Sequence, residues 1–145
     1  MPDAPKHSVS VAAAVIDQDQ RVLVLRRRDN GRWEPPGGIL ELSESIADGL
    51  RREVREETGL RIQPETLTGV YKNLPRGIVA LVFRCRAAGG ALTPTDEADD
   101  FRWLHRSQLA AALTPAYAVR LTDALDYTGS ASIRTHDGEH VLAGL

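Results

Sequence analysis

Residues 38–60 read GILELSESIADGLRREVREETGL, and both the fold and the chemistry of this chain can be approached from them. Ser45 is a residue type that caps helices well, and Asp48 occupies the capping-box position three residues later. Gly59 stands where a left-handed residue commonly ends a helix, because glycine adopts that conformation without a steric penalty. The stretch therefore predicts a helix that begins near Ser45 and ends at Gly59.

Three glutamates share one face of this predicted helix. At 3.6 residues per turn, Glu53, Glu56 and Glu57 lie close together around the helix axis, and Arg52 can pair with Glu56 four residues on. Crowded carboxylates repel one another, and a hard divalent cation such as Mg²⁺ binds carboxylate oxygen and relieves the repulsion. A solvated helix face with Arg–Glu pairs would explain the helix alone at least as well.

The spacing of the wider stretch decides between these two interpretations. It fits the pattern G-x5-E-x7-R-E-U-x-E-E-x-G-U, where U is aliphatic, and a chance match is on the order of one in a billion per starting point at average residue frequencies. The pattern resembles the Nudix box, the motif that defines the Nudix hydrolases. The matching positions are Gly38, Glu44, Arg52, Glu53, Val54, Glu56, Glu57, Gly59 and Leu60.

The resemblance extends beyond the box and covers about residues 8–110. Trp33-Glu34-Pro35-Pro36-Gly37-Gly38 is similar to the W-x-x-P-G-G approach of the family, and Glu97 followed by Trp103 is similar to its downstream acidic loop. One departure is Gly49-Leu50, where members often carry two alanines. Gly49 should cost about 1 kcal/mol of helix stability relative to alanine.

The order of strand-like and helix-like segments indicates an α/β (α+β) fold. Val9–Ile16 and Val22–Leu25 are expected to form a hairpin, and residues 107–113 and 116–127 are expected to be helical. The resemblance implies an α/β/α sandwich with a mixed β-sheet. We expect a single domain over residues 1–145, with a core at about 8–127 and a tail at 128–145 whose role the sequence does not indicate.

The resemblance also implies an activity and a set of site residues. Members use Mg²⁺ or Mn²⁺ to hydrolyse a phosphoanhydride bond in a nucleoside diphosphate linked to another group, such as ADP-ribose or a (d)NTP, including oxidised forms. Carried over by position, the metal ligands are the Gly37 carbonyl, Glu53, Glu56 and Glu57, with Glu97 a further candidate. Arg52 would orient these carboxylates and Glu44 would pair with Arg52. Which carboxylate takes the proton of the attacking water stays open, and Glu97 is one contender.

Candidates for substrate binding are less specific. Arg26, Arg27 and Arg28 enter the loop before the box, where they could hold a phosphate, although a plain solvated loop is as good an interpretation. Trp33 and Tyr71 could stack on a base, but aromatic residues are more often packed in a core or at its rim. We expect the two histidines of His136-Asp137-Gly138-Glu139-His140 to lie in a polar hairpin rather than to bind metal.

The composition restricts the classes of partner that we expect the chain to bind. The 145 residues carry a formal net charge of −2, which argues against a nucleic-acid polymer and leaves a small nucleotide-like substrate as the expected partner. Cys85 is the single cysteine, and no apolar run has the length of a signal peptide or membrane span, so we expect a cytoplasmic protein that does not bind membranes. A homodimer is expected by resemblance alone.

Two other functions fit the same scaffold. A nucleotide-sensing module without turnover would be expected to lose one or more box glutamates, and this chain keeps all of them. An allylic diphosphate isomerase is disfavoured, since Cys85 lies in an apolar strand-like run with no base near it in sequence.

Overall fold

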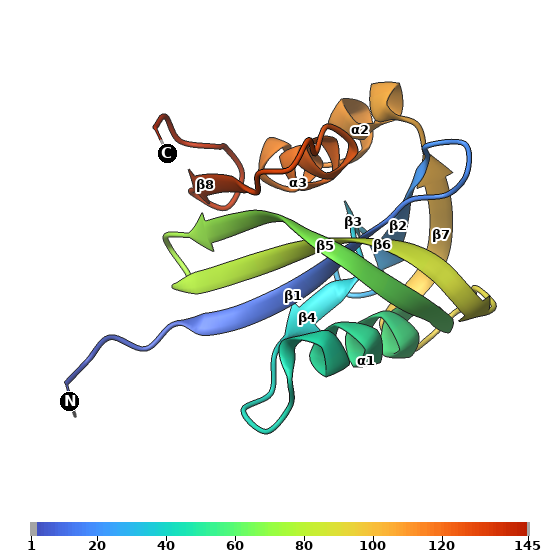
Figure 1. The fold of residues 1–145 in the computed structure, drawn as a ribbon, viewed down its shortest axis with the longest axis horizontal. Coiled ribbons are helices and arrows are strands. Elements are labelled where there is room, and N and C mark those ends of the chain that lie inside the picture. The colour runs from blue at the N-terminus through green and yellow to red at the C-terminus, as the bar shows by residue number, and fades with distance from the viewer. Residues whose placement is uncertain (1–2, 145) are drawn as a thin grey trace.

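The computed structural model describes residues 3–144, in which β-sheets lie between one helix on one side and two helices on the other (Figure 1). The strands are β1 (Ser8–Val15), β2 (Val22–Arg27), β3 (Trp33–Glu34), β4 (Gly37–Ile39), β5 (Leu60–Asn73), β6 (Ile78–Gly90), β7 (Ala98–Leu104) and β8 (Ser132–His136). The helices are α1 (Ile46–Thr58), α2 (Arg106–Ala112) and α3 (Pro115–Leu125).

The strands form two sheets. The larger sheet has the order β4-β1-β6-β5-β8, and the smaller has the order β3-β2-β7. β1 runs parallel to β6 and β5 runs parallel to β8, whereas the other pairs are antiparallel, so the larger sheet is mixed. The α/β/α sandwich with a mixed sheet that the sequence predicted is confirmed.

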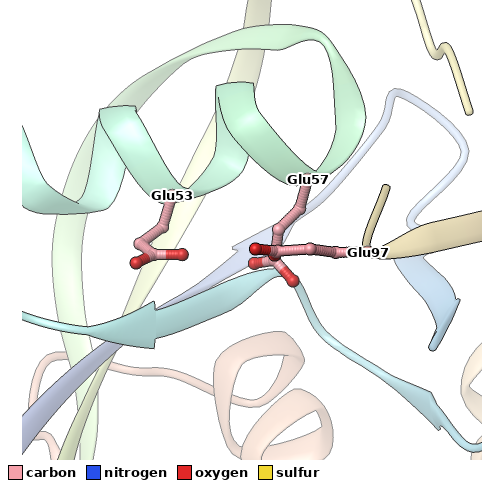
Figure 2. Close-up of side chains that lie close together, drawn as sticks. All are labelled: Glu53, Glu57 and Glu97. Atoms are coloured by element: carbon pink, nitrogen blue, oxygen red, sulfur yellow. The ribbon is translucent and has the colours of Figure 1, made fainter. Parts of the chain in front are cut away.

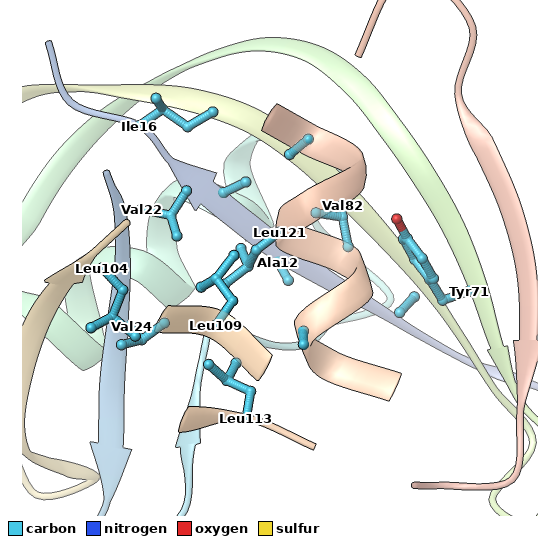
Figure 3. Close-up of a cluster of buried hydrophobic side chains, with 14 residues drawn as sticks. Ala12, Ile16, Val22, Val24, Tyr71, Val82, Leu104, Leu109, Leu113 and Leu121 are labelled. Atoms are coloured by element: carbon cyan, nitrogen blue, oxygen red, sulfur yellow. The ribbon is translucent and has the colours of Figure 1, made fainter. Parts of the chain in front are cut away.

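Strand β1 connects the two hydrophobic layers, because successive side chains of a strand point to opposite faces. Val11, Ala13 and Val15 pack with Leu50 and Val54 of α1. Ala12, Ala14 and Ile16 face the other way, toward α2 and α3, and belong to the cluster drawn in Figure 3. Burial on both faces fixes the register of β1, since a slip by one residue would exchange the two sets of side chains.

Helix α1 begins and ends as the sequence predicted. The Ser45 Oγ accepts a hydrogen bond of 3.1 Å from the backbone N–H of Asp48. Gly59 adopts φ +81°, and its N–H donates to the carbonyl of Arg55 at 2.9 Å. Gly49 is buried, and a Cβ at that position would collide with the side chain of Leu40. The residues before α1 therefore pack closely over this glycine, and an alanine here would require the ends of the Leu40 and Glu44 side chains to shift.

The predicted hairpin of the first two strands is wrong in its pairing. β1 and β2 lie in different sheets and share only the single bridge Ile16↔Val22 at the turn. The reason is that β1 is buried on both faces and pairs with β4 and β6, which leaves no edge of β1 for β2. Alternating apolar residues predict strands but do not say which strands pair.

The two predicted C-terminal helices are confirmed as α2 and α3, and the tail has a structural part as well. Strand β8 within it pairs in parallel with Gly69–Asn73 of β5 and extends the larger sheet. The chain then turns at Asp137-Gly138, and His136 bridges to Val141 as in a short hairpin. The tail therefore covers the edge of β5 that does not pair with β6.

The burial of Cys85 yields a test of the packing. The thiol is fully buried, and burial raises its pKa to about 12. Because the thiolate is the reactive form, Cys85 should resist alkylation by iodoacetamide at pH 8 in the native protein and react fully in denaturant. Mass spectrometry of the two samples measures this difference, and rapid labelling of the native protein would contradict the placement of β6 in the core.

Candidate active site

Three carboxylates from two parts of the chain meet at one end of α1. Glu53 and Glu57 extend from successive turns of the helix, and Glu97 reaches the same point from the residues just before β7 (Figure 2). One carboxylate oxygen of each lies within 4.8 Å of those of the other two, an arrangement that could hold a metal ion. The structure thus brings Glu97, which is far away in sequence, to two of the box glutamates.

Glu57 is the most buried member of this group. Only 4% of the residue is exposed, and its Oε1 accepts a hydrogen bond of 2.7 Å from the backbone N–H of Gly37. Burial raises the pKa of Glu57 to about 8, and the nearby charges of Glu53 and Glu97 act in the same direction. Burial likewise raises the pKa of Glu53, although Arg52 opposes it. These carboxylates need a cation to be ionised together at neutral pH.

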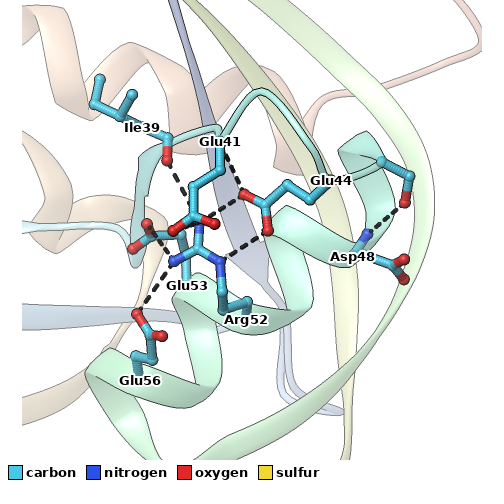
Figure 4. A network of polar contacts seen from close by, with 8 residues as sticks. Ile39, Glu41, Glu44, Asp48, Arg52, Glu53 and Glu56 are labelled. Carbon is cyan, nitrogen blue, oxygen red and sulfur yellow. Dashed lines mark hydrogen bonds and ion pairs between the residues drawn. The ribbon is translucent and has the colours of Figure 1, made fainter.

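Arg52 holds the carboxylates next to this group in place (Figure 4). Its Nε and Nη2 donate to the two oxygens of Glu44 at 2.8 and 2.6 Å, so the predicted Arg52–Glu44 pair is present. Its Nη1 donates to Glu53 at 3.1 Å and to Glu56 at 3.2 Å. A bidentate pair of this kind fixes the guanidinium plane and, through it, the orientation of Glu53.

Glu56 differs from the two other glutamates of the box that were predicted to bind metal. Its side chain is 55% exposed and turns toward Arg52, and it is not a member of the three-carboxylate group. The helical spacing predicted its position on the shared face correctly, but in the structure its carboxylate forms an ion pair with Arg52.

Gly37 and Gly38 allow strand β4 to lie close to both β1 and the Glu53 side chain of α1. A Cβ on Gly37 would collide with the backbone of Val11 and Ala12, and one on Gly38 would collide with the Glu53 carboxylate. Any side chain at either position would displace the strand or Glu53. The two glycines are therefore required by close approach rather than by unusual backbone angles, since neither has a positive φ.

The carboxylates open into a cleft of two adjoining pockets. One pocket, of about 370 Å³, holds Glu53, Glu57 and Glu97. The second, of about 220 Å³, lies against β1 and α3. Both are lined by Arg27, Gly37, Gly38 and Ile39.

The three loop arginines predicted to bind substrate have different surroundings. Arg27 and Arg28 both line the carboxylate pocket. Arg27 also pairs with Asp29 and Glu34, and the Nε of Arg28 donates to the carbonyl of Thr95 at 2.7 Å. Arg26 lines neither pocket of the cleft. Its side chain instead forms an ion pair of 2.8 Å with Asp99 on the neighbouring strand β7.

The two aromatic candidates lie outside the cleft. Tyr71 is fully buried, and its hydroxyl donates to Asp123 at 2.7 Å, so the structure leaves no face of its ring for a base. Trp33 is half-buried, with the guanidinium groups of Arg26 and Arg102 over its ring at 5.8 and 4.7 Å. It borders a separate pocket beside α2. Both aromatics have packing roles here, as the more common interpretation of such residues suggested.

The second pocket contains residues that the sequence did not single out. Asn73 and Arg76 come from the end of β5 and the following turn, and Tyr117 and Arg120 come from α3. One signal was present in the sequence, since Arg120 is a charged residue within the apolar face of a helix that includes Ala116, Leu121 and Ala124. Charged residues are rarely buried without a reason.

The donor set fits a hard divalent cation. Three carboxylates supply only oxygen ligands, which suits Mg²⁺, and burial, which raises the pKa of Glu57, disfavours its charged form unless a cation lies beside it. Within residues 3–144, no helix is long and apolar enough to cross a membrane.

The raised pKa of Glu57 predicts how pH and metal affect stability. A carboxyl group whose pKa is higher in the folded than in the unfolded state stabilises the fold below its unfolded pKa of about 4.5, and this stability is lost as pH rises through about 8. The metal-free protein should therefore lose thermal stability between pH 6 and 8.5. Mg²⁺ should raise the melting temperature more at pH 8 than at pH 6, because a cation replaces the proton.

Differential scanning fluorimetry in EDTA and in millimolar Mg²⁺ measures both effects. The Glu57→Gln variant, which has no titrating group at this position, should lose most of the pH dependence, whereas the exposed Glu65→Gln should keep it. Equal pH profiles for wild type and Glu57→Gln would contradict the assignment to Glu57.

Comparison with known proteins places this site in a family. A family model described as the NUDIX domain matches residues 6–124. A MutT-like protein of Streptomyces ambofaciens is 51% identical over 138 residues, which make up 95% of this chain and 89% of that protein. The 8-oxo-dGDP phosphatase NUDT18 of Danio rerio is 42% identical over 93 residues, which make up 62% of this chain but only 28% of that longer protein.

A solved structure shares the architecture. The crystal structure of an ADP-ribose pyrophosphatase from Streptococcus suis superposes with a TM-score of 0.76 at 23% identity, covering 90% of this chain and 100% of that chain. At this identity the likeness establishes the fold. Together with the family match over most of the sequence, the three converging carboxylates and the Arg52–Glu44 pair show that this chain belongs to the NUDIX family of hydrolases.

Proposed function

We propose that this hydrolase cleaves a phosphoanhydride bond in a nucleoside diphosphate linked to another group, with Mg²⁺ as its cofactor and water as the nucleophile. The observation that carries the proposal is the group of Glu53, Glu57 and Glu97, whose oxygens lie within 4.8 Å of one another beside a cleft. Crowding of this kind is costly without a cation, and a phosphoanhydride is a substrate that brings negative charge to such a cation.

The ligand set for the metal follows from the cleft. Glu53, Glu57 and Glu97 would hold it, with the carbonyl of Gly37 as a further ligand from β4. When bound, the ion supplies charge for the phosphate oxygens and lowers the pKa of a bound water. Mn²⁺ offers the same preference for oxygen ligands and is expected to substitute.

The protein groups around this position divide the remaining tasks. Arg27 and Arg28 line the same pocket and supply positive charge for the phosphates. Arg52 fixes Glu53 through a hydrogen bond of 3.1 Å, and the Gly37 N–H fixes Glu57 at 2.7 Å. The acceptor of the water proton would be one of the three converging carboxylates, because each would lie beside a water held by the metal.

Assays on a panel of candidate nucleotides would identify the substrate. We expect purified protein with Mg²⁺ to hydrolyse at least one member of a set that contains ADP-ribose, 8-oxo-dGDP, 8-oxo-dGTP and the ordinary nucleoside triphosphates. Chromatography of the products, with a parallel sample in EDTA, identifies both the bond that is cleaved and the metal requirement. Absence of turnover across the panel with metal present would favour a nucleotide-sensing module instead.

Removal of the buried carboxylate tests the mechanism. Glu57→Gln keeps the size of the side chain but weakens a metal ligand and removes a base, so kcat should fall by at least about a hundredfold. Steady-state kinetics on the best substrate of the panel measures this change. Glu65→Gln, an exposed glutamate on β5, serves as the matched control and should keep kcat within about twofold. An unchanged kcat in Glu57→Gln would exclude Glu57 from the mechanism.

A further inference from the structure

The second pocket of the cleft contains a buried cation, Arg120, that forms no ion pair with any carboxylate of residues 3–144. Arg120 is 6% exposed, yet it borders the pocket together with Asn73, Arg76 and Tyr117. Among residues 3–144, no oxygen atom accepts a hydrogen bond from its guanidinium, and its Nε–H is buried without any partner. A buried donor that lacks an acceptor is costly, so such a group in a pocket wall indicates a site for an acceptor from outside the protein.

The nearby carboxylates form their hydrogen bonds with other groups, although the charge of Glu34 acts on Arg120 from a distance. Asp123, on the same helix, accepts two hydrogen bonds of 2.7 Å from Arg134 and one from the Tyr71 hydroxyl. Glu34, which lines the same pocket, accepts from Arg27 at 2.9 Å. Neither makes a hydrogen bond with Arg120, and burial lowers the pKa of its guanidinium, as expected for a cation that is removed from water.

The polar neighbour of Arg120 does not satisfy it. Nη2 lies 3.2 Å from Nε2 of the buried His136. The Nδ1 of that ring accepts a hydrogen bond of 3.0 Å from the N–H of Gly138, so the neutral ring carries its proton on Nε2. Burial and the charge of Arg120 lower the pKa of His136, which keeps the ring neutral. The contact therefore places one donor against another.

Two tyrosine rings hold the guanidinium in position. The Cζ of Arg120 lies 4.6 Å from the ring centroid of Tyr117 and 5.2 Å from that of Tyr71. These cation–π contacts offset part of the cost of burial and restrict how the group can move, but they supply no acceptor for its N–H groups. Arg120 is thus a rigid donor in the wall of the cleft.

The character of the pocket suggests a base rather than a phosphate as the occupant. The phosphates belong in the neighbouring pocket, where the carboxylates lie with Arg27 and Arg28. The second pocket combines polar groups with apolar side chains against which a flat ring system could pack, and these are Val11, Ala12, Pro35, Ile39, Ile78 and Tyr117. Nucleobase sites commonly combine such walls with a few fixed polar groups.

We propose that Arg120 is a specificity-determining residue that donates hydrogen bonds to the keto oxygen edge of a purine base of the substrate. A 6-keto purine offers acceptors at O6 and N7, which an arginine can bind together, whereas a 6-amino purine presents a donor in place of O6. The protein should accordingly prefer 6-keto purine nucleotides. This inference rests on the proposed function, since it places a base beside the phosphate pocket.

Binding of reaction products tests the inference separately from turnover. Inosine monophosphate and adenosine monophosphate differ in the groups of the ring edge at C6 and N1, and neither contains a phosphoanhydride bond to cleave. Calorimetric titration of the intact protein with Mg²⁺ should show that the inosine compound binds at least about fivefold more tightly. In Arg120→Met, this preference should fall to within about twofold. Inorganic phosphate, titrated alone, should bind wild type and variant equally.

Measurements of stability and a control variant distinguish a role of Arg120 in base binding from a role in the stability of the fold. Replacing a buried, unpaired charge with an apolar side chain of similar length should leave the melting temperature unchanged or raise it. Arg86→Met, an exposed arginine on β6, should change neither stability nor base preference. If Arg120→Met does not fold, the wild-type comparison still decides. Equal binding of the two nucleotides, no detectable binding of either, or an equal loss for both nucleotides and phosphate in the variant would overturn the proposal.

Discussion

Three like charges held close together are the constraint on which this structure depends. Glu53, Glu57 and Glu97 would separate in a flexible chain, because their mutual repulsion is relieved only by protonation or by a cation. The fold keeps them together, because Glu53 and Glu57 lie one turn apart on α1 and Glu97 comes immediately before β7. Burial, together with the nearby charges of Glu53 and Glu97, raises the pKa of Glu57, and a bound divalent ion would offset both effects.

Core packing provides the rigidity that this arrangement requires. Leu50 and Val54, which lie beside Glu57 on the inward side of α1, are fully buried against β1. The same strand pairs with β4 and so positions Gly37, whose N–H holds Glu57. Helix and strand therefore share one hydrophobic layer, and movement of either would disturb both the ligand spacing and the hydrogen bond.

The sequence predicted what is encoded locally and missed what depends on distant contacts. Helix α1 and its two caps follow from the local sequence, the Arg52–Glu44 pair was implied by the family resemblance of the same stretch, and all are present. The pairing of β1 depends on strands throughout the chain, so the predicted hairpin was wrong. Tyr71 and Trp33 were assigned by residue type, which does not distinguish an aromatic ring in a cleft from one in the core. Arg120 could have been noticed as a charge on an apolar helix face, but its missing acceptor is visible only in three dimensions.

The two ends of the cleft carry groups of opposite charge. At one end carboxylates require a cation, and at the other a guanidinium requires an acceptor. Arg27 borders both, and its ion pairs with Asp29 and Glu34 keep it from neutralising either end fully. A nucleotide would meet both requirements at once, because its phosphates would bring oxygen ligands to a metal and a keto base would bring acceptors to Arg120. Under the proposed function, the two ends together would fix the direction in which such a substrate lies in the cleft before any chemistry begins.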